Sequence, residues 1–162
     1  MLKILLQLLI YVNVLFGGSY YFSEVRYNFA IDKSVEHHGK IDFLQEGLRV
    51  LYPDVNKSLE YKNETLSYKE SNQEIELHEM QSQQIMRYFD ILILIHKGND
   101  DLMSEMFEVT KTSTITTLKP KGMIKNYISN IELLKDKEQL KYIKLFLQNR
   151  DEITINIDDE IR

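Results

Sequence analysis

The chain has 162 residues and a formal net charge of −5, and 43% of its residues are hydrophobic and 28% are charged. This length and composition suit one folded domain with or without an appendage, and they exclude a compositionally disordered chain. Cysteine is absent, which excludes disulfides, thiolate metal sites and a cysteine nucleophile. The acidic balance argues against direct nucleic-acid binding, which requires a basic surface.

The N-terminal segment is apolar and carries no charged residue from position 4 to position 22. As a helix this run extends about 28 Å, close to the ~30 Å hydrocarbon core of a bilayer. Aromatic residues 20–22 stand at its end, where interfacial aromatics lie. The favoured interpretation is a transmembrane anchor over residues 1–22. The alternatives are a signal peptide cleaved near the small residues 17–19 and a buried core helix.

Anchor and signal peptide both place residues 23–162 outside the cytoplasm. Lys3 and the amino terminus favour a cytoplasmic N-terminus, because positive charge is retained on that side of the membrane. We therefore expect a single-pass protein of a bacterial inner membrane with its C-terminal domain in the periplasm. The prolines, Pro53 and Pro120, mark no linker, so residues 23–162 are expected to form one α+β domain.

Several segments alternate apolar and polar residues, which is the pattern of a strand with one buried face. The alternating segments are 59–64, 65–70, 74–80 and 153–158, with a polar hairpin turn over 71–73. Segment 107–118 is rich in Thr and Val, which is also strand composition. The almost continuously apolar run 89–95 predicts a central strand that is covered on both faces.

Helical spacing is confined to fewer segments. Apolar residues recur at three- and four-residue steps over 124–134, which predicts a helix. Segment 140–147 continues this spacing, although a strand fits it as well. A short helix is expected around 43–51. The sequence thus predicts a twisted antiparallel sheet with a few helices, whose edges must be hidden or paired.

The sequence contains no recognisable catalytic, cofactor-binding or metal-binding motif. His37 and His38 are adjacent, so they point in different directions and do not make a metal-ligand pair. The glycines form no phosphate-binding loop, and the many carboxylate pairs fit solvated turns. We therefore expect no enzymatic activity, no cofactor and no metal.

The histidines are candidates for a regulatory role, because histidine changes charge between about pH 5 and 8. Glu36 precedes the histidine pair, and Glu74 and Glu76 share the wet face of a predicted strand with His78. Neighbouring carboxylates stabilise the protonated imidazole. The predicted pH-sensing residues are His37, His38 and His78. The alternative is that they are ordinary surface residues.

An antiparallel sheet with ten tyrosines and seven phenylalanines could also enclose an apolar cavity for a ligand. The alternative is that these aromatic residues are ordinary core packing. The sequence does not decide between the two.

The plan of the chain, an apolar N-terminus followed by a sheet-rich domain, resembles a group of small bacterial inner-membrane regulators. This group comprises ToxS, VtrC, FidL and the MyfF/PsaF proteins of fimbrial regulation. The length and the adjacent His37 and His38 make the chain most similar to MyfF/PsaF. The resemblance implies a lipocalin-like, partly open barrel.

The resemblance also implies a function. Such proteins form a periplasmic heterodimer with a membrane-bound winged-helix transcription activator and stabilise it without contacting DNA. The pair senses acid pH or a small amphipathic ligand such as a bile salt, and it controls virulence or fimbrial genes. The competing hypotheses are an accessory structural subunit of an envelope secretion or pilus assembly complex and, third, a hydrolase without a recognisable motif.

Replacing His37, His38 and His78 together is expected to flatten the pH dependence of signalling, because the titrating charges are removed. The measurement is reporter-gene output of the pathway across pH 5–8. An unchanged response in the triple variant would refute this role.

Overall fold

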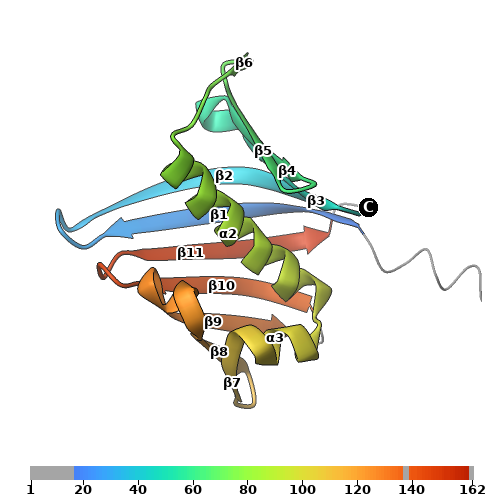
Figure 1. The fold of residues 1–162 in the computed structure, drawn as a ribbon, viewed down its shortest axis with the longest axis vertical. Coiled ribbons are helices and arrows are strands. Elements are labelled where there is room, and N and C mark those ends of the chain that lie inside the picture. The colour runs from blue at the N-terminus through green and yellow to red at the C-terminus, as the bar shows by residue number, and fades with distance from the viewer. Residues whose placement is uncertain (1–16, 137–138, 161–162) are drawn as a thin grey trace, which may run out of the picture.

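The computed structural model describes residues 17–136 and 139–160, most of which form one antiparallel sheet (Figure 1). The strands are β1 (Gly18–Asn28), β2 (Lys33–Leu44), β3 (Gly47–Tyr52), β4 (Lys57–Lys62), β5 (Thr65–Glu70), β6 (Gln73–Glu74), β7 (Phe107–Lys111), β8 (Ile115–Pro120), β9 (Ile128–Asp136), β10 (Gln139–Leu147) and β11 (Glu152–Glu160). Their order in the sheet is β6-β5-β4-β3-β2-β1-β11-β10-β9-β8-β7. The described edge strands β6 and β7 are not paired with each other, so the sheet is an open barrel. The structure confirms the prediction of a β-rich domain built on an antiparallel, partly open sheet.

Two helices connect the halves of the sheet: α2 (Glu79–Lys97) and α3 (Asp100–Met106). Helix α2 runs diagonally across one face of the sheet, called the inner face below, and α3 lies beside its C-terminal end (Figure 1). Gly98 ends α2 in the left-handed conformation, and its N–H donates to the carbonyl of Leu94. The short 3-10 helices are η2 (Pro53–Val55) and η3 (Gly122–Asn126).

The core lies between helix α2 and the inner face. Alternation along each strand places every second side chain on this face, as Leu48 and Val50 do on β3 and Ile143 and Leu145 do on β10. The helix contributes its own buried side chains: Phe89, Ile91, Leu92, Leu94 and Ile95. Folding therefore requires one helix to bury much of the apolar surface of the sheet.

The central strand predicted over 89–95 is wrong, because these residues form the C-terminal half of helix α2. A short apolar run does not distinguish a doubly covered strand from a buried helix. Here α2 packs on the sheet and α3 lies beside its C-terminal end, and Phe89, Ile91, Leu92, Leu94 and Ile95 are buried (Figure 1).

The helix predicted over 124–134 is also wrong, because η3 is followed by strand β9. In the pairing with β10, Asn130 faces Phe146 and Ile128 faces Leu147, so Ser129 is skipped as a β-bulge. The extra residue brings Ile128 and Ile131 to the same buried face at a spacing of three, which imitates a helix. Segment 140–147, for which both alternatives were open, is strand β10.

Two further predictions need correction. The short helix expected around 43–51 is the end of β2, a turn and strand β3, in which the buried Leu48 and Val50 alternate with the half-buried Arg49 and Leu51. The strand predicted over 74–80 ends at Glu74, and residue 79 begins helix α2. The strands predicted over 59–64 and 65–70 are confirmed as β4 and β5, and the predicted polar turn after Glu70 joins β5 to the short β6. The strand over 153–158 is confirmed within β11, and 107–118 forms the hairpin of β7 and β8.

The predicted anchor over residues 1–22 lies mostly outside the described residues. Its last part, from Gly18 to Phe22, belongs to strand β1, where Phe22 is buried in the core. In the part of the chain that the structure describes, neither helix is long and apolar enough to cross a membrane.

Leu118→Ala is expected to lower the free energy of unfolding by about 2–5 kcal/mol, because Leu118 is fully buried and its removal leaves a cavity. Leu102→Ala is the matched control: Leu102 is 46% exposed, so its change should stay within about 0.5 kcal/mol. Urea denaturation of both variants measures the difference. Equal losses would contradict this core assignment.

Candidate functional site

Strand β1 carries a charged side chain into the core beneath helix α2. Alternation places Phe22, Glu24 and Arg26 on the inner face, and Glu24 is only 1% exposed. Among the described residues, Glu24 is the one polar or charged side chain that is buried within the core. A buried carboxylate requires hydrogen-bond donors and a compensating charge.

Both carboxylate oxygens of Glu24 accept hydrogen bonds. The Nε of Arg26 donates to Oε1 at 2.5 Å, and the hydroxyl of Tyr52 on β3 donates to Oε2 at 3.1 Å. Burial disfavours the charge on Arg26, but the Glu24 carboxylate outweighs burial and raises the pKa of the guanidinium above its ordinary value. Glu24 and Arg26 therefore form an ion pair whose carboxylate is buried and whose arginine side chain is 55% exposed.

The side chain of Tyr88 on helix α2 faces the same ion pair. Its hydroxyl is buried and has no hydrogen-bond partner in the described structure. Burial, followed by the charge of Glu24, raises the pKa of Tyr88 well above its ordinary value. The hydroxyl therefore keeps its proton and is an unused donor, which costs roughly 1–3 kcal/mol when it is buried.

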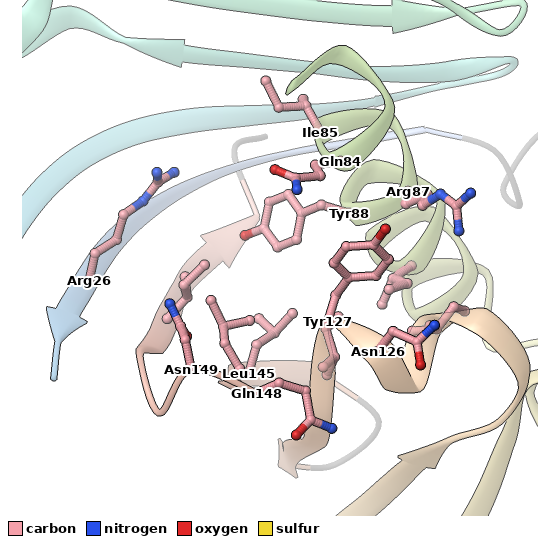
Figure 2. A pocket seen from close by; sticks show the side chains of 15 residues that line it. Arg26, Gln84, Ile85, Arg87, Tyr88, Asn126, Tyr127, Leu145, Gln148 and Asn149 are labelled. Atoms are coloured by element: carbon pink, nitrogen blue, oxygen red, sulfur yellow. The ribbon is translucent and has the colours of Figure 1, made fainter. Parts of the chain in front are cut away.

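Two hollows lie on either side of these residues. The first, called the apolar hollow, has a volume of about 520 Å³ and lies between α2, η3 and strands β9 to β11. Its apolar lining consists mainly of Ile85, Ile91, Ile124, Leu145, Leu147 and Ile153. Figure 2 shows Tyr88 reaching from α2 across this hollow, with Arg26 and Arg87 on opposite sides of it.

The second, called the polar hollow, has a volume of about 400 Å³ and lies between α2 and strands β1 to β5. Its polar lining includes Glu24, His37, Tyr52, Lys57 and Tyr68. The two hollows share four lining residues: Arg26, Gln84, Ile85 and Tyr88. They are therefore adjacent parts of one groove along α2.

Only one of the three predicted pH-sensing histidines reaches this groove. His37 pairs with Glu24 across strands β1 and β2 and lines the polar hollow, where its ring lies 6.0 Å from that of Tyr52. Its Nδ1 lies 3.7 Å from a carboxylate oxygen of Asp54. The polar hollow thus contains one titratable imidazole beside the Glu24 ion pair.

The other two histidines lie elsewhere. His38 points to the opposite face of β2, where its side chain is 70% exposed and lies 3.6 Å from Glu36. His78 is not on a strand with Glu74 and Glu76, as was predicted; it is the exposed residue that precedes helix α2. The structure therefore does not bring His37, His38 and His78 together. Their role in pH sensing stays a prediction.

Reasoning from sequence missed the groove residues Glu24, Arg26, Tyr52 and Tyr88. No period-two contrast marks Glu24 in the sequence, because Tyr21 stands between Tyr20 and Phe22 and the charged Glu24 shares the buried face of Phe22. Reading the apolar N-terminus as a membrane segment also drew residues 18–22 away from the strand. The predicted central strand over 89–95 likewise concealed the helix that carries Tyr88.

Within residues 17–136 and 139–160, no group of three His, Asp or Glu side chains comes close enough to hold a metal ion. The groove combines apolar surface with arginine side chains and tyrosine hydroxyls, which can contact a bound molecule. Concave, largely apolar surfaces with a few polar groups are the usual form of ligand sites, so the groove is the candidate site of this fold.

Neither a protein-family model nor a curated protein matches the sequence. Among solved structures, the fold is similar to a DUF1329 family protein from Desulfovibrio piger, with 8% sequence identity and a TM-score of 0.42. The match covers 95% of this chain and 88% of that chain.

Removing Arg26 should destabilise the protein, because Glu24 would stay buried with one donor fewer. We expect Arg26→Met to lower the free energy of unfolding by about 1–3 kcal/mol. Adding Glu24→Gln should recover part of this loss, because the uncompensated charge disappears.

The matched control is Arg49→Met, because Arg49 forms an ion pair with Glu60 in which both side chains are about 40% exposed. An exposed pair contributes at most about 1 kcal/mol. Chemical denaturation of the variants checks the result. If Arg26→Met costs no more than Arg49→Met, the Glu24 ion pair is not buried as described.

Proposed function

We propose that the protein binds an amphipathic ligand in the groove beneath helix α2. The observation that carries the proposal is the apolar hollow, about 520 Å³ in volume and lined largely by isoleucine and leucine, next to the buried ion pair. Ligand sites are usually concave, largely apolar and equipped with a few polar groups, and their volumes run from about 300 to 1,000 Å³. The apolar hollow has these properties.

A hollow of this kind is unfavourable in an empty protein, because its apolar lining loses contacts or stays in contact with water. Ile85 and Ile153, which lie on opposite walls, are only partly buried although both pack against the core. An apolar chain in the hollow would cover them. Binding therefore gains roughly 25 cal/mol for each Å² of apolar surface that leaves water.

We further propose that binding takes place outside the cytoplasm, at the inner membrane. The apolar N-terminal residues support export. Strand β1 takes residues 18–22 of the apolar run, so an anchor or a signal peptide would have to be formed by the uncharged residues 4–17 before it.

The regulatory role that the resemblance implies is a second proposal. The outer edge of β7 offers unpaired backbone groups in the described sheet, and such edges pair readily with strands of another chain. This supports a heterodimer with a membrane-bound transcription activator that responds to acid or to the bound amphipath. Copurification with a single activator would favour it, whereas copurification with a large secretion or pilus complex would favour the structural alternative.

A bulky side chain that fills the apolar hollow should weaken ligand binding. The full chain, recovered from cells and exchanged into amphipol if it is membrane-bound, is titrated with the uncharged probe N-phenyl-1-naphthylamine, and fluorescence is recorded. We expect saturable binding, and we expect Ile85→Trp to weaken it at least tenfold because the indole occupies the hollow.

Leu51→Trp is the matched control, because Leu51 lies on the outer face of β3 between Val50 and Tyr52. It should bind the probe as the unaltered chain does. Absence of binding by the unaltered chain, or equal losses in the two variants, would contradict the proposed function.

A further inference from the structure

The two hollows differ in the charged side chains that line them rather than in how apolar they are. Both have apolar walls, since Val55, Leu59, Leu77 and Phe89 line the polar hollow, but the polar hollow adds the side chains of Glu24, His37 and Lys57. Because Arg26 and Tyr88 line both hollows, one molecule could extend through the two and present its polar part to these side chains. The position of the polar residues thus orients an amphipath in the groove.

The charges that face the groove favour an anion. Arg26 and Arg87 line the apolar hollow, and none of its described lining residues is acidic. In the polar hollow, Glu24 is the one carboxylate among the described lining residues, beside the cations Arg26 and Lys57; Lys57 also pairs with Glu70, 3.6 Å away. Cationic lining in a chain of net charge −5 is a local feature rather than a property of the whole surface.

The hydrogen bonds around Glu24 also favour a ligand that carries a hydrogen-bond acceptor. The carboxylate of Glu24 already accepts from Arg26 and Tyr52, so it does not need the hydroxyl of Tyr88. The buried Tyr88 hydroxyl has no partner in the described structure and retains its proton. An incoming oxygen that accepts a hydrogen bond would remove this deficit.

We propose that the ligand carries an anionic head group, a carboxylate or a phosphate, which binds Arg26 and the Tyr88 hydroxyl at the junction of the two hollows. Its apolar chain then lies in the apolar hollow. This inference rests on the proposed function, since it names the chemistry of the ligand in that groove. A charge-assisted hydrogen bond of this kind contributes more than a neutral one.

The test compares ligands that share one chain and differ in the head group. Oleate, 1-oleoyl lysophosphatidate and uncharged oleyl alcohol are each used to displace N-phenyl-1-naphthylamine from the full chain. We expect at least one of the anions to displace the probe at an at least tenfold lower concentration than the alcohol. The stronger of the two anions identifies the head group as carboxylate or phosphate.

Tyr88→Phe should reduce the advantage of that anion by about tenfold and leave oleyl alcohol unchanged. This variant removes a hydroxyl that has no hydrogen-bond partner in the described structure, so it should fold as well as the parent chain. Tyr142→Phe is the matched control, because the Tyr142 hydroxyl donates to Glu132 on the outer face. It should leave all three displacements unchanged.

Two failures can be told apart. If the unaltered chain does not bind the probe, the proposed function fails and this inference fails with it. If the probe binds but both anions and the alcohol displace it equally, or if Tyr88→Phe leaves the anion's advantage intact, only the anionic head group is refuted.

Discussion

The structure depends on the burial of a wide sheet by one narrow helix. Eleven strands at a spacing of ~4.8 Å span about 48 Å across the sheet, whereas a helix with its side chains is about 10–12 Å wide. The sheet therefore has to curl around α2, and the helix still cannot cover the whole inner face. Where α2 packs closely, residues such as Leu92 and Leu94 are buried; beside its N-terminal half, the groove is left.

The charge in the core lies at the middle of this groove. A carboxylate as buried as Glu24 is costly unless it is paired and hydrogen-bonded. An apolar residue at this position of β1 would fit the core without that cost, so the ion pair with Arg26 is not explained by stability. Its place between the apolar and polar hollows, with the unpartnered Tyr88 hydroxyl opposite, is what the proposed recognition of a polar head group requires.

Much of the sheet could be predicted from period-two patterns, because strands such as 59–64 and 153–158 have one wet and one buried face. The errors arose where burial or irregularity removed that contrast. Most residues of 89–95 are buried although they are helical, and the bulge at Ser129 imitates helical spacing. The site depends on contacts distant in sequence: Glu24, Tyr52 and Tyr88 meet only after folding, and no local pattern contains all three. The histidines were visible as residue types, but their positions on opposite faces of β2 and before α2 could be read only from the structure.

Amide hydrogen exchange of the full chain with and without oleate tests the central claim most directly. A ligand in the groove should slow exchange in helix α2 and in strands β1, β10 and β11, whose residues line the hollows. Helix α3 and strands β7 and β8 contribute no lining residue in the described structure and provide an internal reference. Protection confined to α3, β7 and β8, or no protection at any oleate concentration, would contradict a binding groove beneath α2.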